Sequence, residues 1–510
     1  MLASIRSASV IGIDAIDVTV EVDVVPGLPS WTIVGLASNA VKEARERVTA
    51  ALANSGFDVP SRRITVNLSP ADVRKDGTSF DLPIALALLA ATGAIDPAKL
   101  TGLMVAGELG LDGSIRPIRG TLSLARAAAR AKARLLVPEA NVAEAMLVRS
   151  RGVATAAMLA TLVAELRNGG PSPVSPDSMA GASSAAGAES PDFTDVVGQA
   201  SAKRALEIAA AGGHNVLMMG PPGTGKTMLA RRLPGILPAL TEDELLEVVA
   251  IHSVGGLVMP GTIPSRTPPF RAPHHTISLA GLIGGGPGPR PGEVSLAHRG
   301  VLFLDELLEL PRHVLDAMRQ PLEDGRVVIA RAAHAVAFPA RFQLIAAANP
   351  CKCGYAASQD GRCQCSTTDI ERYRSRLSGP LADRIDLHVH VGTVEIAALG
   401  VAPNEESSAA IRDRVAIARD RQRTRYADLA GAWTNAEVPG RWLLAHGGVS
   451  RDAHAQIIDS ARQLGMSARG FHRALRVART IADLDGESGV GASAMAEALH
   501  YRGSAMTRGN

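Results

Sequence analysis

The sequence lacks an excess of either charge, and it lacks long uncharged apolar runs. Lysine and arginine number 53 against 50 aspartates and glutamates, which leaves a net charge of +3 over 510 residues. This balance neither supports nor excludes a nucleic-acid partner, so any basic surface must be local. The first residues lead straight into alternating, strand-like sequence, without the pattern of a signal peptide. We therefore expect a cytoplasmic protein with no membrane-spanning segment.

Cysteine is also scarce. The four cysteines all fall between Cys351 and Cys365, in two Cys-x-Cys pairs completed by Cys353 and Cys363. In a reducing compartment such a cluster favours metal over disulfides, and four thiolates can close a tetrahedral Zn²⁺ site. A redox pair and buried apolar cysteines are the competing interpretations. If zinc is bound, we expect it to be structural and to fix a loop that follows Asn349.

The remaining composition permits sizeable cores, because 46% of the residues are hydrophobic. The length suggests about three domains. Residues 1–167 mix alternating strands with helical periodicity and predict an α+β domain. Residues 168–191 are rich in Gly, Pro, Ser and Ala and predict a flexible linker. Strands alternating with helices over residues 192–395 predict an α/β domain with a parallel sheet, and residues 396–510 predict a small helical domain.

The most informative stretch is a glycine-rich turn between an apolar strand and a helix. Glycines let backbone N–H groups surround an anion, and the helix N-terminus adds partial positive charge. In this P-loop pattern Lys226 would reach the β- and γ-phosphates of a nucleotide, and the Thr227 hydroxyl would take one Mg²⁺ position. The candidate nucleotide-binding residues are Gly220, Pro221, Pro222, Gly223, Thr224, Gly225, Lys226 and Thr227.

Two further apolar strands end in polar side chains. One closes on Asp305 and Glu306, and the other closes on Asn349. In a parallel sheet these ends meet the P-loop at one edge. Asp305 would hold Mg²⁺ directly or through water, Glu306 would polarise the attacking water, and Asn349 would orient that water. The cofactors expected are therefore ATP and Mg²⁺.

Two sets of arginines are candidates for phosphate contacts, although a solvated basic face is the simpler interpretation of both. Arg384 lies between two aspartates, whereas Arg469, Arg473 and Arg476 share one face of a predicted helix. Arg469 would reach the γ-phosphate within the same subunit. Arg384 would act on the nucleotide of a neighbouring subunit, which requires a ring.

A Gly- and Pro-rich segment separates the two nucleotide motifs. Its paired His274 and His275 suggest a metal site, but no cysteine or carboxylate accompanies them in the sequence, which favours a loop role. Together with Arg271 and Arg290 they are candidates for contacts to a phosphate backbone.

Taken together, these motifs resemble those of an AAA+ ATPase. Residues 270–278, 290–298 and 301–307 resemble one branch, the magnesium-chelatase-like ComM (YifB-type) family, and the resemblance covers nearly the whole chain. It implies a ribosomal-S5/Lon-protease-like domain before an AAA+ module with a helical lid. It also implies an insert in helix 2 near Ile251–Arg299 and a hairpin near Val327–Pro339.

The resemblance further implies a function and residue roles. The family is expected to form a hexameric ATP-dependent ring that moves single-stranded or branched DNA during recombination and natural transformation, with recombination proteins as partners. By motif, Asn349 corresponds to sensor 1, Arg384 to the arginine finger and Arg469 to sensor 2. The alternatives are a chelatase-type ATPase that remodels a protein partner and a Lon-like ATP-dependent protease.

The protease alternative depends on the N-terminal domain. Residues 76–79 resemble the Lon-type nucleophile motif and include Ser79, but Leu, Ser and Leu stand at 122–124, where the catalytic lysine of that family is expected. A serine needs a base to act as a nucleophile. We therefore expect Ser79 to serve a turn or helix cap, with Lys75 or Lys132 as the alternative base.

Overall fold

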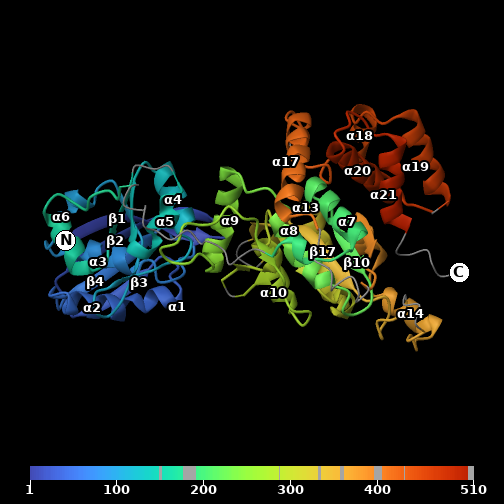
Figure 1. Ribbon diagram of the computed structural model, residues 1–510. Helices are drawn as coiled ribbons and strands as arrows, with labels where there is room; N and C mark the ends of the chain where they lie inside the picture. Colours follow the sequence, from blue (N-terminus) through green and yellow to red (C-terminus); the bar gives the residue numbers. More distant parts are fainter. Residues whose placement is uncertain are drawn as a thin grey trace.

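We describe the fold from a computed structural model of the chain. Two sheet-containing parts lie side by side with helix α9 between them, and a group of helices lies at the far end (Figure 1). The expected linker at 168–191 falls largely on residues 176–190, which lie outside the described part of the chain. The structure describes residues 1–148, 152–175, 191–286, 288–330, 335–356, 361–394, 405–429, 431–463 and 465–503.

The N-terminal part contains a seven-stranded mixed sheet in the order β3-β4-β2-β1-β5-β8-β9. The alternating strand sequence expected in residues 1–167 is seen in the second strand, where Val18, Val20, Val22 and Val24 all face the core. The strands are β1 Leu2–Ile11, β2 Asp14–Val25, β3 Ser30–Val34, β4 Arg63–Ser69, β5 Leu103–Val105, β8 Arg134–Pro138 and β9 Val153–Ala156; β6 Glu108–Leu109 and β7 Ile115–Arg116 form a separate hairpin.

Helices cover this first sheet. Helix α3 Asp81–Ala91 follows Phe80, and its residues are all buried. Its uniformly apolar sequence suits a helix packed on several sides rather than a surface helix. The other helices of this part are α1 Asn39–Lys42, α2 Ala44–Asn54, α4 Thr121–Arg130, α5 Val142–Ala145 and α6 Leu159–Arg167.

The second sheet has five parallel strands in the order β11-β14-β17-β10-β18. Both of its faces are covered, since Val216 and Met218 belong to one core cluster and Leu217 to another. Burial on both faces explains why these strands read as continuous apolar runs. The strands are β10 Val216–Met219, β11 Phe270–Arg271, β14 Val301–Leu304, β17 Gln343–Ala348 and β18 Leu387–His390.

Helices and two hairpins surround the second sheet. The helices are α7 Ala200–Gly212, α8 Lys226–Ile236, α9 Glu242–Gly255, α10 Leu279–Ile283, α11 Glu293–Leu296, α12 Arg312–Ala317, α13 Arg319–Asp324, α14 Thr367–Arg374 and α15 Gly379–Ala382. The hairpins pair β12 Gly284–Gly285 with β13 Arg290–Pro291, and β15 Arg326–Ala330 with β16 Ala335–Pro339. Five helices follow: α17 Ser408–Arg425, α18 Gly440–His446, α19 Arg451–Gln463, α20 Ala468–Leu484 and α21 Ala492–Gly503.

One of the two insertions differs from the expectation. The hairpin expected near Val327–Pro339 is present as β15–β16. The range Ile251–Arg299, expected as a helix-2 insert, instead contains β11, which pairs with β14 as the edge strand of the main sheet. An insertion within a helix cannot contain a strand of the central sheet. The inserted segment is therefore shorter than the range Ile251–Arg299 and corresponds to the β12–β13 hairpin between α10 and α11.

The two parts of the molecule meet at helix α9. Leu122 of α4 is fully buried against Leu245, Val248 and Val249 of α9. Leu122 belongs to the segment where the Lon-like pattern expects a lysine, and an apolar contact between helices explains why no charge stands there.

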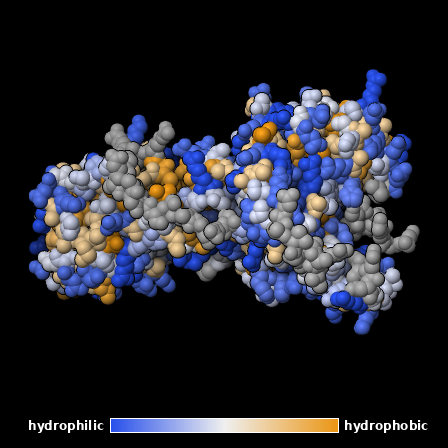
Figure 2. All heavy atoms as spheres, viewed as in Figure 1, coloured by the Kyte–Doolittle hydropathy of each residue, from blue (hydrophilic) through white to orange (hydrophobic). Residues whose placement is uncertain are grey.

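The visible surface is mostly hydrophilic, and hydrophobic residues gather only in small separate areas of the face in Figure 2. Within the part of the chain that the structure describes, no helix combines the length and apolarity needed to cross a bilayer.

Candidate functional site

The polar ends of three neighbouring strands meet at one edge of the second sheet. Met219 of β10 pairs with Ala348 of β17, and Leu304 of β14 pairs with Ala346 of β17. Because the strands run parallel, the residues that follow them emerge at the same carboxyl edge. The P-loop, the Asp305–Glu306 pair and Asn349 are therefore neighbours in space, as their sequence positions predict.

The backbone of the P-loop requires glycine at defined positions. A Cβ atom on Gly220 would lie 2.1 Å from the carbonyl oxygen of Val391, which no side chain tolerates. Gly223 and Gly225 have φ values of 77° and 88°, and no atom lies within 4 Å of a Cβ built on either. The turn is therefore left-handed and opens onto free space just before α8 begins at Lys226.

Lys226 is held by neutral acceptors. Its ammonium donates to the carbonyls of Gly220 at 2.7 Å and Pro221 at 2.8 Å, and to Oδ1 of Asn349 at 3.3 Å. Burial lowers the pKa of Lys226, and the nearby charge of Asp305 partly opposes that effect. A buried cation whose hydrogen-bond acceptors are all neutral gains free energy from an added anion, so the loop suits a phosphate.

Thr227 and Asp305 supply the oxygen ligands that Mg²⁺ prefers. The Thr227 hydroxyl donates to Oδ2 of Asp305 at 2.6 Å, although the two residues lie 78 positions apart in the chain. A hydroxyl and a carboxylate side by side, next to the phosphate-ready turn, fit a magnesium ion that is shared with a nucleotide. Mg²⁺ held here would neutralise phosphate charge.

Glu306 follows in an unusual backbone conformation. Its φ and ψ are 49° and 44°, in the left-handed region, and its amide donates to Oδ1 of Asp305 at 2.9 Å. Its carboxylate lies against the ring of His275, with 2.8 Å between Nδ1 and Oε2. Left-handed backbone at a non-glycine residue is characteristic of functional sites, where the surroundings fix an unfavourable geometry.

The contact between His275 and Glu306 is one that the sequence does not predict. The sequence favours a loop role for the histidine pair because no carboxylate accompanies it along the chain, yet Glu306 reaches His275 from the end of another strand. The signal that would have found it is the pairing of β11 with β14, which places the residues after Arg271 beside those after Leu304. With only two residues, β11 is too short to be recognised by periodicity.

The two candidate phosphate-binding arginines lie at the opposite edge of the sheet. Arg384 precedes β18, and its guanidinium pairs with Glu323 and donates to the Pro380 carbonyl at 2.6 Å. Arg469, the second residue of α20, lies on the same side, 3.9 Å from Glu323. Because α20 packs near the amino ends of the strands, Arg469 lies away from the P-loop of its own chain, and its expected contact with a γ-phosphate stays a prediction.

A polar cavity of about 580 Å³ is lined by Arg469 and Glu323. Arg473 and Arg476, which share the helix face of Arg469, also line it, together with Asp386. Arg473 forms an ion pair with Asp386, whose carboxylate also accepts from the Asn215 amide at 3.0 Å. Burial would raise the pKa of Asp386, but Arg473 and His214 outweigh burial and hold its pKa far below the usual range. The set is thus anchored to the sheet by an internal ion pair, while Arg469 remains largely exposed.

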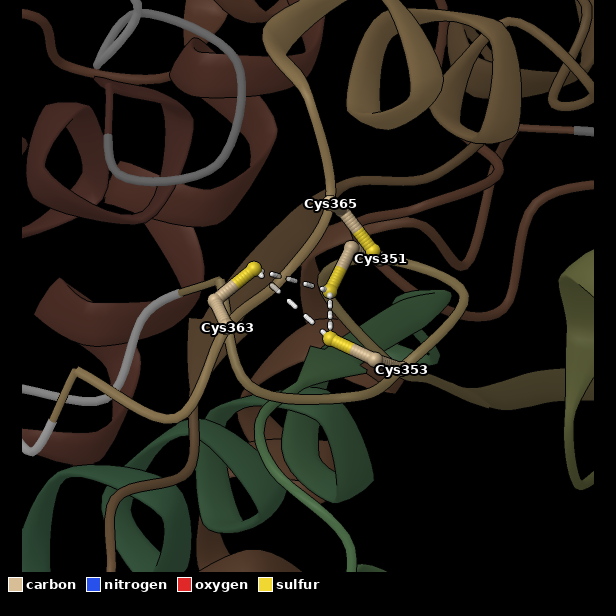
Figure 3. A group of neighbouring side chains, drawn as sticks. All are labelled: Cys351, Cys353, Cys363 and Cys365. Carbon is tan, nitrogen blue, oxygen red and sulfur yellow. Dashed lines mark hydrogen bonds between the residues drawn. The ribbon is translucent and has the colours of Figure 1, made fainter.

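The four cysteines form one compact group (Figure 3). The Sγ of Cys351 lies 3.3 Å from that of Cys353 and 3.8 Å from that of Cys363, and all four sulfurs lie within 4.8 Å of one another. A tetrahedral zinc–thiolate site has sulfur–sulfur edges of about 3.8 Å. The group therefore fits Zn²⁺.

The cysteine loop also packs against the P-loop. A Cβ atom added to Gly354, which follows Cys353, would lie 2.6 Å from Cδ of Pro222. Gly354 has a φ of 89° and lies where only glycine permits this close approach. The position of the nucleotide loop is thus tied to the position of the cysteine loop.

The remaining candidates in the Gly- and Pro-rich segment differ in availability. Arg271 is engaged in a bidentate ion pair with Glu293, at 2.6 and 2.8 Å. His274 contacts Thr276 through Nδ1 at 2.8 Å and leaves its ring exposed, and Arg290 is exposed on β13. Arg271 therefore serves the fold, whereas His274 and Arg290 remain available to a ligand.

The N-terminal serine motif is occupied by structural contacts. The Ser79 carbonyl accepts from Gly107, and Asp81, two residues on, forms a bidentate ion pair with Arg47 at 2.6 and 2.9 Å. Lys75 is fully buried and donates to the carbonyl of Pro70, and burial lowers its pKa. Lys132 is exposed. The motif thus joins the start of α3 to α2 and to the β6 segment.

Comparison with known families gives one consistent match along the chain. Residues 192–399 match the model described as magnesium chelatase, subunit ChlI. Residues 20–141 match subunit ChlI of Mg-chelatase, and residues 405–502 match the ChlI C-terminal model.

Individual relatives extend this match. The chain is 43% identical over 506 residues to the uncharacterized protein YifB of Salmonella typhimurium, covering 98% of this chain and 97% of that protein. It is 42% identical over 510 residues to the competence protein ComM of Haemophilus influenzae, covering 99% and 98%. It is 28% identical over 324 residues to the chloroplastic magnesium-chelatase subunit ChlI of Chlamydomonas reinhardtii, covering 58% and 71%.

Proposed function

Because the chain belongs to the magnesium-chelatase-like family that includes ComM and YifB proteins, we propose that it is a Mg²⁺-dependent ATPase that drives a DNA motor. The observation that carries the proposal is the grouping of Lys226, Thr227, Asp305, Glu306 and Asn349 at one sheet edge. Each side chain has the chemistry that phosphoryl transfer to water requires.

In this function the residues act in sequence around a bound nucleotide. The P-loop amides and Lys226 hold the phosphates, and Thr227 and Asp305 hold Mg²⁺. Glu306 accepts a proton from the attacking water as the water approaches the γ-phosphorus. Asn349 orients that water and accepts a hydrogen bond from Lys226. Catalysis here is positioning and charge stabilisation, which a rigid sheet edge supplies.

We further propose that the active form is a ring, with a hexamer as the expected size. Arg384 and Arg469 lie at the edge of the sheet opposite the P-loop of their own chain, and Arg469 lines a polar cavity there. From there either arginine would serve a nucleotide held by a neighbouring subunit. To do so, Arg384 would have to exchange Glu323 for a phosphate.

Single-stranded or branched DNA is the proposed substrate, in recombination and uptake of transforming DNA, with recombination proteins as partners and the cytoplasm as the site of action. The support is the near full-length similarity to a protein named for competence. The exposed His274 follows β11, which pairs with β14, and the exposed Arg290 lies on β13. Both are candidates for phosphate-backbone contacts.

The proposed organisation has four segments. Residues 1–167 form an S5/Lon-like domain without protease activity, 168–191 a linker, 192–395 the AAA+ domain and 396–510 the helical lid. Zn²⁺ on the four cysteines is proposed as a structural ion that holds the cysteine loop against Pro222. Ser79 is assigned a structural role, because its neighbourhood is joined by Arg47, Asp81 and backbone contacts.

A forked-duplex and four-way-junction assay tests the motor. The expected result is ATP-dependent strand separation or branch movement by the wild-type protein, and none by Glu306→Gln. An active ATPase that moves no strand on any substrate would reject the motor and leave the ATPase in place.

The second candidate is a chelatase-type ATPase that remodels a protein partner. The family models named for magnesium chelatase favour it. It predicts that a protein partner, and not DNA, stimulates ATP turnover, so adding each to the purified ATPase separates the two functions.

A further inference from the structure

The N-terminal part of the molecule packs against the rest of the chain at several points. Helix α4 meets α9 through Leu122, and the Gly261 amide donates to the Ala140 carbonyl at 2.9 Å. The turn between β1 and β2 reaches a hairpin, because a Cβ atom on Gly12 would lie 2.8 Å from Cγ1 of Val336 on β16. Gly12 has a φ of 63°, so this close approach uses a backbone conformation that favours glycine. The N-terminal part is therefore fitted to the β15–β16 hairpin as well as to α9.

The β12–β13 and β15–β16 hairpins also pack against each other. A Cβ atom on Gly284 of β12 would lie 3.1 Å from Cδ1 of Ile329 on β15, and Ile329 pairs with Val336. Directly paired residues share one face of a hairpin, so Ile329 and Val336 point to the same side. Val336 is accordingly 6% exposed, whereas Val328, on the opposite face, is 42% exposed. The β1–β2 turn thus closes on the face through which the two hairpins meet.

A carboxylate of the N-terminal part lies at the tip of the β12–β13 hairpin. A Cβ atom on Gly288, two residues before Arg290, would lie 3.3 Å from Oδ2 of Asp76. Gly285 and Gly286 also belong to this tip and have φ values of 150° and 99°. Glycines with positive φ can turn backbone N–H groups toward an anion. Asp76 therefore brings negative charge to a glycine turn that is followed by an arginine.

A carboxylate and a phosphodiester present the same chemistry to this hairpin tip. Each carries negative charge on oxygen atoms that accept from amide N–H groups and from a guanidinium. Oδ1 of Asp76 accepts from the adjacent Gly77 amide at 2.9 Å, which leaves Oδ2 beside the hairpin. A DNA phosphate bound at the tip would take the place of this oxygen.

We propose that the N-terminal part is a cover over the two hairpins, with Asp76 held where a DNA phosphate binds. DNA displaces the carboxylate, and the β1–β2 turn then separates from β16. The inference rests on the proposed DNA motor and adds a control on its access to DNA. The cover acts on DNA binding and on the stimulation of ATP turnover by DNA, and not on turnover without DNA.

Asp76→Asn removes the charge and keeps the size of the side chain and its contact to Gly77. The affinity for single-stranded DNA should rise about five- to tenfold, because one charged contact that competes with DNA is weakened. Asp112→Asn is the matched control, since Asp112 is an exposed aspartate in another turn of the N-terminal part and accepts from the nearby Ser114 amide. Its affinity should stay within about twofold of wild type.

Fluorescence anisotropy with labelled single-stranded DNA measures both affinities. Equal rises in Asp76→Asn and Asp112→Asn would show a general effect of charge and overturn the role of Asp76. An affinity of Asp76→Asn equal to that of wild type would overturn it as well. Thermal unfolding of each variant checks that it is folded.

A reversible cross-link tests whether the cover has to move. Gly12→Cys combined with Val336→Cys places two thiols within reach of a disulfide, which mild oxidation should form. The locked protein should bind DNA about tenfold more weakly or worse and lose its stimulation by DNA, because the open form is no longer populated. Basal kcat should stay within about twofold, and reduction should restore DNA binding. Each single-cysteine variant, treated with the same oxidant, controls for oxidation of the four native cysteines.

Unchanged DNA affinity in the locked protein would overturn the cover and leave the motor in place. A different result would reject DNA as the substrate of the proposed function, and the cover with it. That result is an active ATPase with no DNA binding by wild type, by Asp76→Asn or by the reduced double-cysteine variant.

Discussion

Two regions of the molecule are built alike and differ in what their polar groups face. Each has a buried lysine next to a glycine turn that leads into a helix: Lys75 before α3, and Lys226 at the start of α8. Burial lowers the pKa of both lysines. Local sequence alone would make either turn a candidate site.

The difference lies in the neighbouring strands. Around Lys75 the polar groups satisfy one another, since Thr78 pairs with Glu108 and Asp81 with Arg47. Around Lys226 the ends of two strands place Asp305 and Asn349 beside an open glycine turn. A buried lysine thus marks a ligand site only where the ends of parallel strands place further polar side chains, such as Asp305 and Asn349, beside it and leave space for an anion.

The largest expected difference comes from removing each lysine in turn. Lys226→Met should weaken ATP binding at least about a hundredfold, because a buried charge-assisted contact to phosphate is lost. Lys75→Met should leave the affinity within about twofold, since it removes only a contact to a carbonyl. Titration with a fluorescent ATP analogue measures both. Equal losses in both variants, with folding intact, would erase the distinction between the two regions.

The next largest effect is expected on kcat, from removal of the arginine that a neighbouring subunit would contribute. Arg384→Ala should lower kcat about a hundredfold while ATP still binds, because one donor to the transition state is missing. Mixing Arg384→Ala with Glu306→Gln subunits should restore part of the activity if Arg384 acts across an interface. Phosphate release by the mixture against each variant alone decides this, and full activity of Arg384→Ala by itself would remove the need for a ring.

Loss of zinc should act on the nucleotide loop at a distance. Cys353→Ser should reduce the bound zinc and lower ATP affinity roughly tenfold, because the loop that supports Pro222 is no longer fixed. Gly354→Ala, which retains the ligands but displaces Pro222, should weaken ATP binding without losing zinc. Elemental analysis beside ATP titration tests both. Zinc loss with unchanged ATP affinity would disconnect the two loops.

How much of this arrangement can be predicted from the sequence depends on how far apart along the chain the contacting residues lie. The strands that end at Gly220, Asp305 and Asn349 are continuous apolar runs, and parallel topology is sufficient to bring their ends together. β11 has only two residues, and β18 carries two histidines among its four residues, so neither stands out as an apolar run. The position of Arg469 could not be predicted because it depends on how α20 packs on the sheet, which no local pattern encodes. The contact between His275 and Glu306 required knowing which strand borders β14.

The smallest effect is expected in the N-terminal region. Ser79→Ala should leave ATP turnover unchanged and alter the free energy of unfolding by no more than about 0.5 kcal/mol, because the contacts that hold this corner come from Asp81, Arg47 and the backbone. Casein should remain intact with either protein. Casein degradation by wild type that Ser79→Ala abolishes would make the N-terminal region a second active site.

The central claim is that ATP binds at the P-loop and is hydrolysed by water that Glu306 activates. Its most direct test is ATP binding and phosphate release, measured side by side on wild-type and Glu306→Gln protein with Mg²⁺ and DNA. We predict equal binding and a loss of turnover of about a hundredfold or more in the variant. Undiminished turnover by Glu306→Gln, or a wild-type protein that neither binds nor hydrolyses ATP, would contradict the claim.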